Sequence, residues 1–347
     1  MSATIVARAP GKIFLTGEYA VLAAAPALVA AIDRYAEVRM AIGAASGPCT
    51  IESLADGRRY TIDDPEHEQP LGGDVGAVLA ALRVASAWAP SIAGREVTAV
   101  VDSTPFLAPG GRKLGLGRSA ATVTAAVAAL LALAGHRDRA EVFEAAVAAH
   151  ALFQEGRGSG ADVAAAAHGG VIAFRRDGGR IDVAPRALPP GLRVVVGWTG
   201  EPVPTDPIVR RFTSHVAAVE PRALIALRAV AERAAEAAGA GDVAAFSSAV
   251  AESADALDEL GRELGIPIVT PTLAKLIAAA HRVGAIAKPS GAGGGDCGIA
   301  FAASAEQADA VRAAWHEVGI VPLDVSLAPR GVEIDERDVA GAEVPVG

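Results

Sequence analysis

The sequence is poor in cysteine and in aromatic residues, and both shortages limit what the protein can be. It has 2 cysteines, Cys49 and Cys297, in 347 residues. Two cysteines cannot build a disulfide framework or a cysteine-based metal cluster, and they fit a reducing compartment, so we expect a cytoplasmic protein. Aromatic residues make up only 4% of a chain that is 52% hydrophobic. We therefore expect a globular protein whose core is packed mainly by Ala, Val, Leu and Ile.

The sequence also lacks an excess of positive charge and a membrane-spanning segment. The net charge is −9, whereas non-specific nucleic-acid binding needs a basic surface, so we expect no nucleic-acid partner. The N-terminus, MSATIVARAPGK, lacks the apolar core of a signal peptide. The most apolar run, residues 119–135, is shorter than the ~20 residues that a membrane helix needs. It predicts a buried helix and no membrane association.

Strand-like and helix-like segments are mixed without a regular βαβ rhythm, which predicts an α+β architecture. The length favours two domains, because single cores rarely grow beyond about 250–300 residues. The pattern changes within residues 187–192, so we predict an N-terminal domain of residues 1–188 and a C-terminal domain of residues 189–347.

Local signals predict most helices and several strands. Thr270 and Pro271 form a helix start, and Pro221 is expected to interrupt a long helix. Residues 9–12 (APGK) are expected to form a turn. The expected helices span residues 75–89, 119–134, 139–154, 208–238, 242–264, 271–283 and 305–318, and the expected strands span residues 4–8, 27–40, 60–62, 95–103, 192–198 and 298–303.

Three glycine-rich segments stand out, at residues 110–119, 156–162 and 291–298. Glycine reaches positive φ without strain, so such loops can bring their backbone close to a ligand, often a phosphate. Residues 293–298 match the spacing G-x-G-x-x-G. A strand-like run follows instead of a helix, which excludes a dinucleotide-binding fingerprint. A hairpin turn without a ligand remains an alternative for this loop.

The segment KLGLGRSAAT, residues 113–122, is the best candidate for a phosphate site. It places glycines directly before a helix, whose first N–H groups lack internal partners and whose dipole favours anions. Lys113 and Arg118 add positive charge. Ser119 is either the N-cap of the helix or a magnesium ligand. No position satisfies the Walker A pattern.

Two charged residues beside glycines have both a structural and a functional interpretation. Lys12 is either a solvated lysine or a cation held between buried segments, with Glu18 as a potential ion-pair partner. Asp162 is either a helix N-cap or a carboxylate beside a phosphate, acting as a base or a metal contact. His150 and His168 fit zinc only by residue type, and without an H-E-x-x-H motif we exclude a zinc enzyme of that kind.

Three stretches resemble, in order, the three motifs of the GHMP small-molecule kinases. They are APGKIFLTGEYAVL (residues 9–22), KLGLGRSAAT (residues 113–122) and KPSGAGGGDCGIAF (residues 288–301). Within that superfamily, GEYAVL, GSGADVAAAAHGG and SGAGGGDCGIA are most similar to the phosphomevalonate kinases. The resemblance covers essentially the whole chain. It implies the GHMP kinase fold, with an N-terminal domain like ribosomal protein S5 domain 2 and a C-terminal ferredoxin-like domain.

The resemblance implies ATP-dependent phosphorylation of 5-phosphomevalonate to 5-diphosphomevalonate in the mevalonate route to isoprenoids. The implied cofactors are ATP and Mg²⁺, and the implied partner is the small-molecule substrate phosphomevalonate, bound by a monomer or a homodimer. One alternative is a mevalonate kinase or another GHMP alcohol kinase. Another is a non-catalytic protein of the same fold that senses a ligand.

The resemblance also implies the site residues. Lys12 and Asp162 would be catalytic, and Ser119 would help to hold Mg²⁺. The implied nucleotide-binding residues are Lys113, Gly115, Leu116, Gly117, Arg118, Ser119 and Ala120. The implied substrate-binding residues are Lys12, Ser159, Gly160, Ser290, Gly291, Ala292, Gly293 and Arg210. The family usually has Ser where this chain has Arg118, and Glu155 is a candidate for a magnesium carboxylate.

Overall fold

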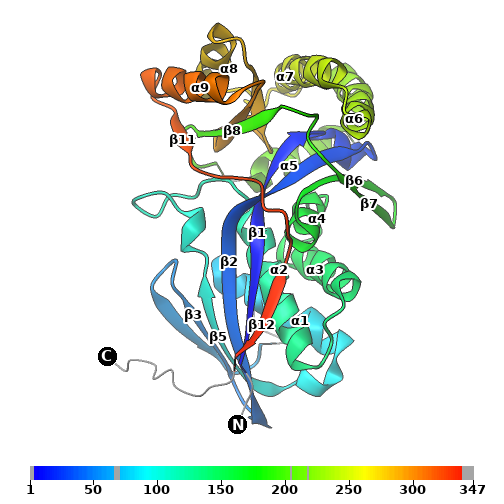
Figure 1. The fold of residues 1–347 in the computed structure, drawn as a ribbon. Coiled ribbons are helices and arrows are strands. Elements are labelled where there is room, and N and C mark those ends of the chain that lie inside the picture. Colours follow the sequence, from blue (N-terminus) through cyan, green and yellow to red (C-terminus); the bar gives the residue numbers. More distant parts are fainter. Residues whose placement is uncertain (1–3, 66–70, 204, 217–218, 338–347) are drawn as a thin grey trace.

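A computed structural model describes residues 4–65, 71–203, 205–216 and 219–337. It contains two β-sheets with helices packed against them, one built mainly from the first half of the chain and one from the second (Figure 1). This mixture of layers confirms the expected α+β architecture.

The first sheet has eight strands, and six of them follow the order β12-β1-β2-β5-β3-β4. β6 pairs with β2 and β7, and all pairs are antiparallel except β3 with β5. Its strands are β1 (Thr4–Thr16), β2 (Ala27–Ser46), β3 (Cys49–Ser53), β4 (Arg58–Ile62), β5 (Arg95–Asp102), β6 (Val171–Asp177), β7 (Arg180–Arg186) and β12 (Glu333–Arg337).

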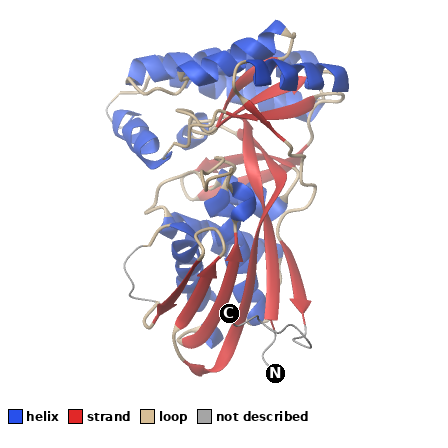
Figure 2. Ribbon diagram, turned by 90° about the vertical axis from the view of Figure 1, so that its left-hand side faces the viewer, coloured by secondary structure: helices blue, strands red, loops and turns tan. Residues whose placement is uncertain are grey.

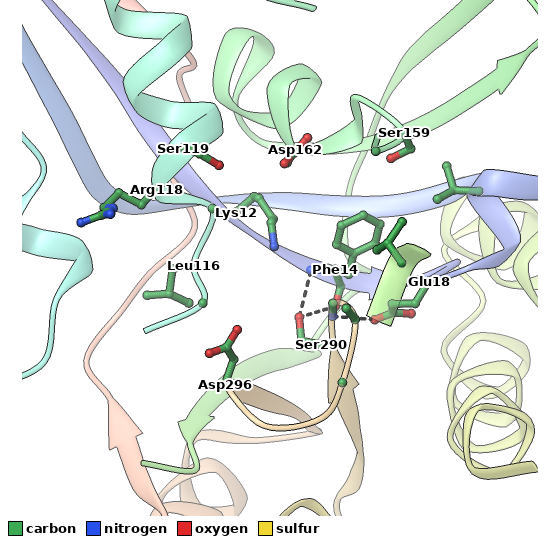
Figure 3. Close-up of a pocket in the computed structure, with 18 of the residues that line it drawn as sticks. Lys12, Phe14, Glu18, Leu116, Arg118, Ser119, Ser159, Asp162, Ser290 and Asp296 are labelled. Carbon is green, nitrogen blue, oxygen red and sulfur yellow. Dashed lines mark hydrogen bonds between the residues drawn. The ribbon is translucent and has the colours of Figure 1, made fainter. Parts of the chain in front are cut away.

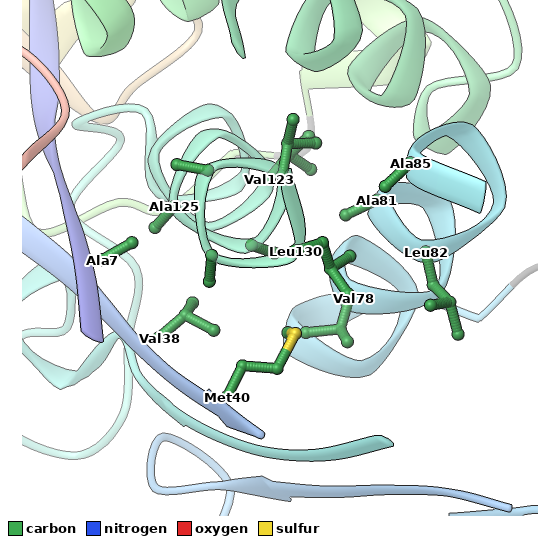
Figure 4. Packing of buried hydrophobic residues seen from close by; sticks show 14 of the residues in the cluster. Ala7, Val38, Met40, Val78, Ala81, Leu82, Ala85, Val123, Ala125 and Leu130 are labelled. Carbon is green, nitrogen blue, oxygen red and sulfur yellow. The ribbon is translucent and has the colours of Figure 1, made fainter. Parts of the chain in front are cut away.

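Helices cover one face of this sheet (Figure 2). They are α1 (Gly73–Trp88), α2 (Arg118–Leu133), α3 (Arg139–Phe153) and α4 (Ala161–His168). Every residue of α2 from 120 to 132 is buried. Its alanines and valines pack on β1 and β2 on one side and on α1 on the other (Figure 4). The expected buried helix is confirmed, and no described helix is long and apolar enough to cross a membrane.

The second sheet is antiparallel, with the order β11-β8-β10-β9. In chain order the unit runs strand, helices, two strands, helix and strand, so this order is the ferredoxin-like arrangement. Its strands are β8 (Arg193–Trp198), β9 (Ile286–Ser290), β10 (Cys297–Ala302) and β11 (Val321–Leu323). Its helices are α5 (Thr205–Val216), α6 (Arg222–Ala240), α7 (Val243–Leu264), α8 (Pro271–Arg282) and α9 (Ala305–Glu317).

Helix boundaries with a local cause are confirmed. The Thr270 side chain accepts a hydrogen bond from the Leu273 N–H, and Pro271 is the first residue of α8. Pro221 separates α5 from α6 and is the N-cap of α6.

Other expectations about the backbone are wrong. Residues 9–12 form no turn, because β1 runs through them, and within this segment its pairing with β2 shows a register shift between Pro10 and Gly11. The sequence pattern also misses β12, which pairs with β1 near the chain end. The predicted domain boundary at residue 188 falls between β7 and β8 and remains a proposal. β12 pairs with β1 and so belongs with the N-terminal domain, although it lies near the other end of the chain.

Candidate active site

A cavity of about 300 Å³ opens where β1, the start of α2, the start of α4 and the β9–β10 loop meet (Figure 3). Most of the site residues predicted from the sequence line it. These are Lys12, Lys113, Gly115, Leu116, Gly117, Arg118, Ser119, Ser159, Asp162, Ser290, Gly291, Ala292 and Gly293. Ala120 and Gly160 are not lining residues, although each belongs to a helix start at the cavity, and Arg210 is an exposed residue of α5 that does not line it.

β1 carries Lys12 across the cavity. The Lys12 N–H donates to the Leu116 carbonyl at 2.8 Å, which joins the strand to the glycine segment before α2. A Cβ at Gly117 would lie 2.9 Å from Lys12 Cγ, so the lysine stem runs directly over that glycine. The ammonium lies 5.3 Å from the centre of the Phe14 ring, near enough for a cation–π interaction. Lys12 is therefore held in the cavity rather than extended into solvent (Figure 3).

The start of α2 provides backbone N–H groups without a side-chain cap. Gly117 is the N-cap residue with φ of 83°, and Gly115 has φ of 78°, both in the left-handed region that favours glycine. Ser119 is therefore inside the first turn and is not the N-cap. The free N–H groups of a 16-residue helix, with Lys12 beside them, form a site suited to an anion. Figure 3 shows the Arg118 guanidinium turned away from Lys12.

Asp162 lies in the first turn of α4 and faces the cavity with a side chain that is 21% exposed (Figure 3). Gly160 is the N-cap of this helix, so the capping interpretation of Asp162 is wrong. The Asp162 carboxylate accepts a hydrogen bond from the Val163 N–H at 3.0 Å. Ser159 contributes a hydroxyl that accepts from the Ala161 N–H at 3.2 Å.

The β9–β10 loop is attached to β1 at the mouth of the cavity. The Ser290 hydroxyl accepts from the Phe14 N–H and donates to the Phe14 carbonyl, both at 3.0 Å. The Tyr19 hydroxyl donates to the Ala292 carbonyl. A Cβ at Gly293 would lie 2.8 Å from Ile268 Cγ2, so only glycine fits there. The loop thus forms a wall of the cavity and begins a strand, not a helix.

Glu18 does not pair with Lys12, and that expectation is wrong. Its partner is Lys288 on β9, and the two side chains are 2% and 0% exposed. Burial lowers the pKa of the Lys288 ammonium, and the neighbouring Glu18 carboxylate opposes this shift. Glu18 Oε1 also accepts from the Gly291 N–H at 3.4 Å, so this pair joins the glycine loop to the residues that follow β1.

Lys113 and Asp296 come from the two halves of the chain and lie next to each other in the cavity lining. Lys113 Nζ lies 3.7 Å from Asp296 Oδ2 and donates to the Val203 carbonyl. Burial raises the pKa of the Asp296 carboxyl, while Lys113, the Val203 N–H and Lys12 act in the opposite direction. The sequence alone gives no role for Asp296, although it follows directly on the glycine loop.

Glu155, the candidate magnesium carboxylate, does not line the cavity. Its side chain is 61% exposed and pairs with Arg157 at 2.7 Å. His150, which the sequence suggested only as a zinc ligand by residue type, lies instead beside two residues of the site. It is 2% exposed, and its ring lies between Ser119 and Asp162. The sequence around His150 does not indicate these contacts, because only the packing of α3 against α2 and α4 brings the three residues together.

Comparison with known proteins identifies the family. Residues 78–170 match the family described as GHMP kinases N terminal domain, and residues 226–321 match GHMP kinases C terminal. These matches cover more than half of the chain. The phosphomevalonate kinase of Streptomyces sp. (strain CL190) is 33% identical over 95% of this chain and 98% of its own length. The mevalonate kinase of Aeropyrum pernix is 28% identical over 95% of this chain and 98% of its own.

Solved structures show the same fold. The Streptococcus pneumoniae phosphomevalonate kinase, solved in complex with phosphomevalonate and AMPPNP, superposes with a TM-score of 0.77 at 24% identity. The superposition covers 93% of this chain and 99% of that one. The two family matches, the Streptomyces relative and the shared fold lead to one conclusion: this chain belongs to the GHMP kinases, a family of phosphotransferases.

Proposed function

We propose that the protein transfers the γ-phosphoryl group of ATP to 5-phosphomevalonate, forming 5-diphosphomevalonate in the mevalonate route to isoprenoids. The observation that carries this proposal is the charge of the cavity. Its lining includes four basic side chains, Lys12, Lys113, Arg118 and Arg157. They occur in a chain whose net charge is −9. A cavity for ATP and a second phosphorylated molecule needs such a local concentration of positive charge.

Three acidic side chains also line the cavity, and they do not cancel this character. Glu18 is already paired with the buried Lys288. Asp296 faces Lys113, and burial raises its pKa. Asp162, in the first turn of α4, is the third acidic side chain of the lining. Arg157 pairs with Glu155 in turn, so Lys12 and the uncapped start of α2 are the main positive groups of the cavity, and they suit phosphorylated substrates.

The residues divide the work of phosphoryl transfer, which depends on positioning and charge neutralisation more than on covalent chemistry. The N–H groups at the start of α2 would bind phosphate oxygens of ATP, and Gly115 and Gly117 let the backbone approach them. Lys12, which lies between this loop and Gly291, would neutralise the oxygens of the transferred group.

Mg²⁺ fits the cavity, although it would need few protein ligands. Among the described residues, no group of three or more His, Cys, Asp or Glu side chains could hold a metal ion. Mg²⁺ usually keeps several waters and binds one or two protein groups together with substrate phosphates. The Ser119 hydroxyl and the Asp162 carboxylate, which flank one histidine ring, would hold it. When bound, the ion would neutralise charge on the phosphate oxygens.

The acceptor is supported by similarity as well as by charge. The Streptomyces relative is named a phosphomevalonate kinase, but more distant relatives are named mevalonate kinases. ADP release should therefore be measured with purified protein, ATP and Mg²⁺ against phosphomevalonate, mevalonate and homoserine. We expect the highest kcat/KM with phosphomevalonate. Faster turnover of mevalonate would establish an alcohol kinase, and tight nucleotide binding without turnover of any acceptor would favour a sensor.

A further inference from the structure

His150 has contacts with two separate parts of the cavity wall. It is on α3, which packs against both α2 and α4. Its Nε2 lies 3.2 Å from the Ser119 hydroxyl on α2, and its Nδ1 lies 3.9 Å from Asp162 Oδ1 on α4. The ring is 2% exposed and stacks near Phe153, with the ring centroids 6.2 Å apart and the planes 20° from parallel. The imidazole is thus fixed in orientation, and each of its nitrogens faces a different residue of the site.

We propose that His150 is a positioning residue that sets the orientation of the Ser119 hydroxyl and keeps Asp162 at the cavity wall. This inference rests on the proposed function, because it concerns how the site binds a magnesium–nucleotide complex. His150 does not line the cavity itself and therefore acts only through these two side chains.

The chemistry of the ring determines which role each nitrogen has. A neutral imidazole has one N–H donor and one acceptor nitrogen. With the proton on Nδ1, the ring presents a positive N–H dipole to the Asp162 carboxylate, at a distance too long for a hydrogen bond but short enough for attraction. Nε2 is then the acceptor for the Ser119 hydroxyl proton.

This arrangement prepares Ser119 to bind a cation. A serine hydroxyl has one proton and two acceptor lone pairs. When the proton is directed at His150, both lone pairs are free for Mg²⁺, and the repulsive O–H dipole is turned away from the ion. Partners of metal ligands act in this way in many sites, and their loss typically weakens metal binding or activity by about 10–100-fold.

Two substitutions at His150 test the roles of its two nitrogens separately. His150→Gln can place an amide oxygen near the position of Nε2 and so retains an acceptor for Ser119. The shorter side chain of His150→Asn places its amide group near the position of Nδ1, toward Asp162, and leaves no acceptor for Ser119. His168→Gln is the matched control, because His168 is also a partly buried histidine, its ring lies against Phe143, and it does not line the cavity.

The deciding measurement is binding of a nonhydrolysable ATP analogue by calorimetry, with Mg²⁺ and with EDTA, alongside thermal unfolding. In wild type, Mg²⁺ should tighten binding. We expect His150→Asn to weaken binding of the analogue in Mg²⁺ by about 10–100-fold. Its binding in EDTA should change little. His150→Gln and His168→Gln should stay within about threefold of wild type, because the acceptor for Ser119 is retained or untouched. kcat should follow the same order, with KM for the acceptor changed less.

The outcomes distinguish this inference from the proposed function. Wild-type protein that binds magnesium–nucleotide but turns over no phosphomevalonate contradicts the proposed function, while the order of the His150 variants still tests the positioning role. Equal losses for His150→Asn, His150→Gln and His168→Gln, or equal losses with Mg²⁺ and with EDTA, would show a merely structural histidine. Wild-type binding that is no tighter with Mg²⁺ than with EDTA would also overturn the inference.

Discussion

The Lys288 ammonium on β9 donates a hydrogen bond to the Glu18 carboxylate, and the two side chains are 0% and 2% exposed. The residues are 270 positions apart in the sequence. Lys288 also donates to the Pro289 carbonyl, and Glu18 accepts from the Gly291 N–H. A fully buried ion pair therefore joins the β9–β10 loop, one wall of the candidate active site, to the segment that follows β1.

Breaking this pair on one side should destabilise the protein strongly. Lys288→Met leaves a buried carboxylate without its cation, and we expect a loss of about 3–5 kcal/mol in the free energy of unfolding. The double variant Glu18→Leu/Lys288→Met should lose less than the sum of the single variants, because it removes both buried charges. Chemical denaturation measures both effects.

A surface pair provides the comparison. Arg312→Met removes the partner of Asp309, whose side chain is 76% exposed, and should cost no more than about 1 kcal/mol. If Lys288→Met cost as little as Arg312→Met, the buried pair would not be holding the loop in place.

Two glycines with the same backbone conformation should respond differently to alanine. Gly115 and Gly111 have φ of 78° and 75°. A Cβ at Gly115 would lie 2.6 Å from Asp296 Cγ, whereas a Cβ at Gly111 would meet nothing within 4 Å. Each alanine adds about 1 kcal/mol or more of strain from the left-handed conformation. Gly115→Ala must also displace Asp296 or the loop, and we expect it to lower kcat at least about tenfold.

Gly111→Ala is the matched control for that loss of activity, since it carries the same conformational strain in open space. Thermal unfolding should show about 1 kcal/mol or more of destabilisation for Gly111→Ala and a larger loss for Gly115→Ala, and steady-state kinetics should show a lower kcat only for Gly115→Ala. Equal kcat values for the two variants would mean that the contact between the phosphate loop and Asp296 is unimportant for turnover.

Features with a short-range cause could be predicted from the sequence. Thr270 and Pro271 start α8 because a hydroxyl and a missing N–H suit the first turn of any helix. Pro221 breaks the expected helix because its ring does not fit in a helix interior, and it becomes the N-cap of α6. The glycine clusters predicted loops whose backbone can approach a ligand closely. Gly115 and Gly117 do adopt positive φ, and Gly117 lies against the Lys12 side chain.

Features that depend on tertiary packing could not be predicted in this way. Nothing in the sequence near Glu18 indicates a partner 270 residues away, so Lys12 was the natural but wrong choice. The pairing of β12 with β1 is equally remote along the chain. His150 is an ordinary residue of α3 until that helix packs between α2 and α4. The N-cap alternative for Ser119 and Asp162 came from their residue types, whereas glycines with positive φ occupy both cap positions.

Asp296 should make stability depend on pH in an unusual direction for a carboxyl group. Burial raises its pKa above the ordinary value of 3.8, so the folded state holds the proton more tightly than the unfolded state does. The stabilisation from protonated Asp296 is complete below that ordinary value and is lost as the pH rises through the raised folded-state pKa. Relative to Asp296→Asn, wild type should therefore lose stability as the pH rises from the ordinary value of 3.8 through the raised folded-state pKa.

Denaturant titrations of both proteins at several pH values test this dependence, and Asp309→Asn on the surface serves as the reference for a simple loss of charge. A wild type that gains stability over Asp296→Asn as the pH rises would contradict the expectation. Lys113 and the Val203 N–H would then outweigh the effect of burial at this site.

Asp162 provides a test of the acceptor that does not depend on substrate affinity. The second pKa of a phosphomonoester is about 6, so phosphomevalonate is largely dianionic at pH 7 and has little proton for a base to remove. An alcohol acceptor must lose its proton during transfer, and general-base catalysis contributes about 10²–10⁴-fold to such a step. Asp162→Asn should therefore reduce kcat less with phosphomevalonate than with mevalonate, because only its orienting role is lost.

Asp138→Asn is the matched control for Asp162→Asn. Asp138 is the N-cap of α3, accepts from the Ala140 and Glu141 N–H groups, and lies outside the cavity lining. Asn caps a helix about as well as Asp, so this substitution should change the melting temperature little and leave kcat unchanged with either acceptor. A loss for Asp162→Asn that is equally large with both acceptors, with a pH–rate profile for phosphomevalonate that still requires a deprotonated carboxylate, would show that Asp162 acts as a base. The phosphate acceptor would then have to react as its monoanion, since only that form carries a proton for Asp162 to remove.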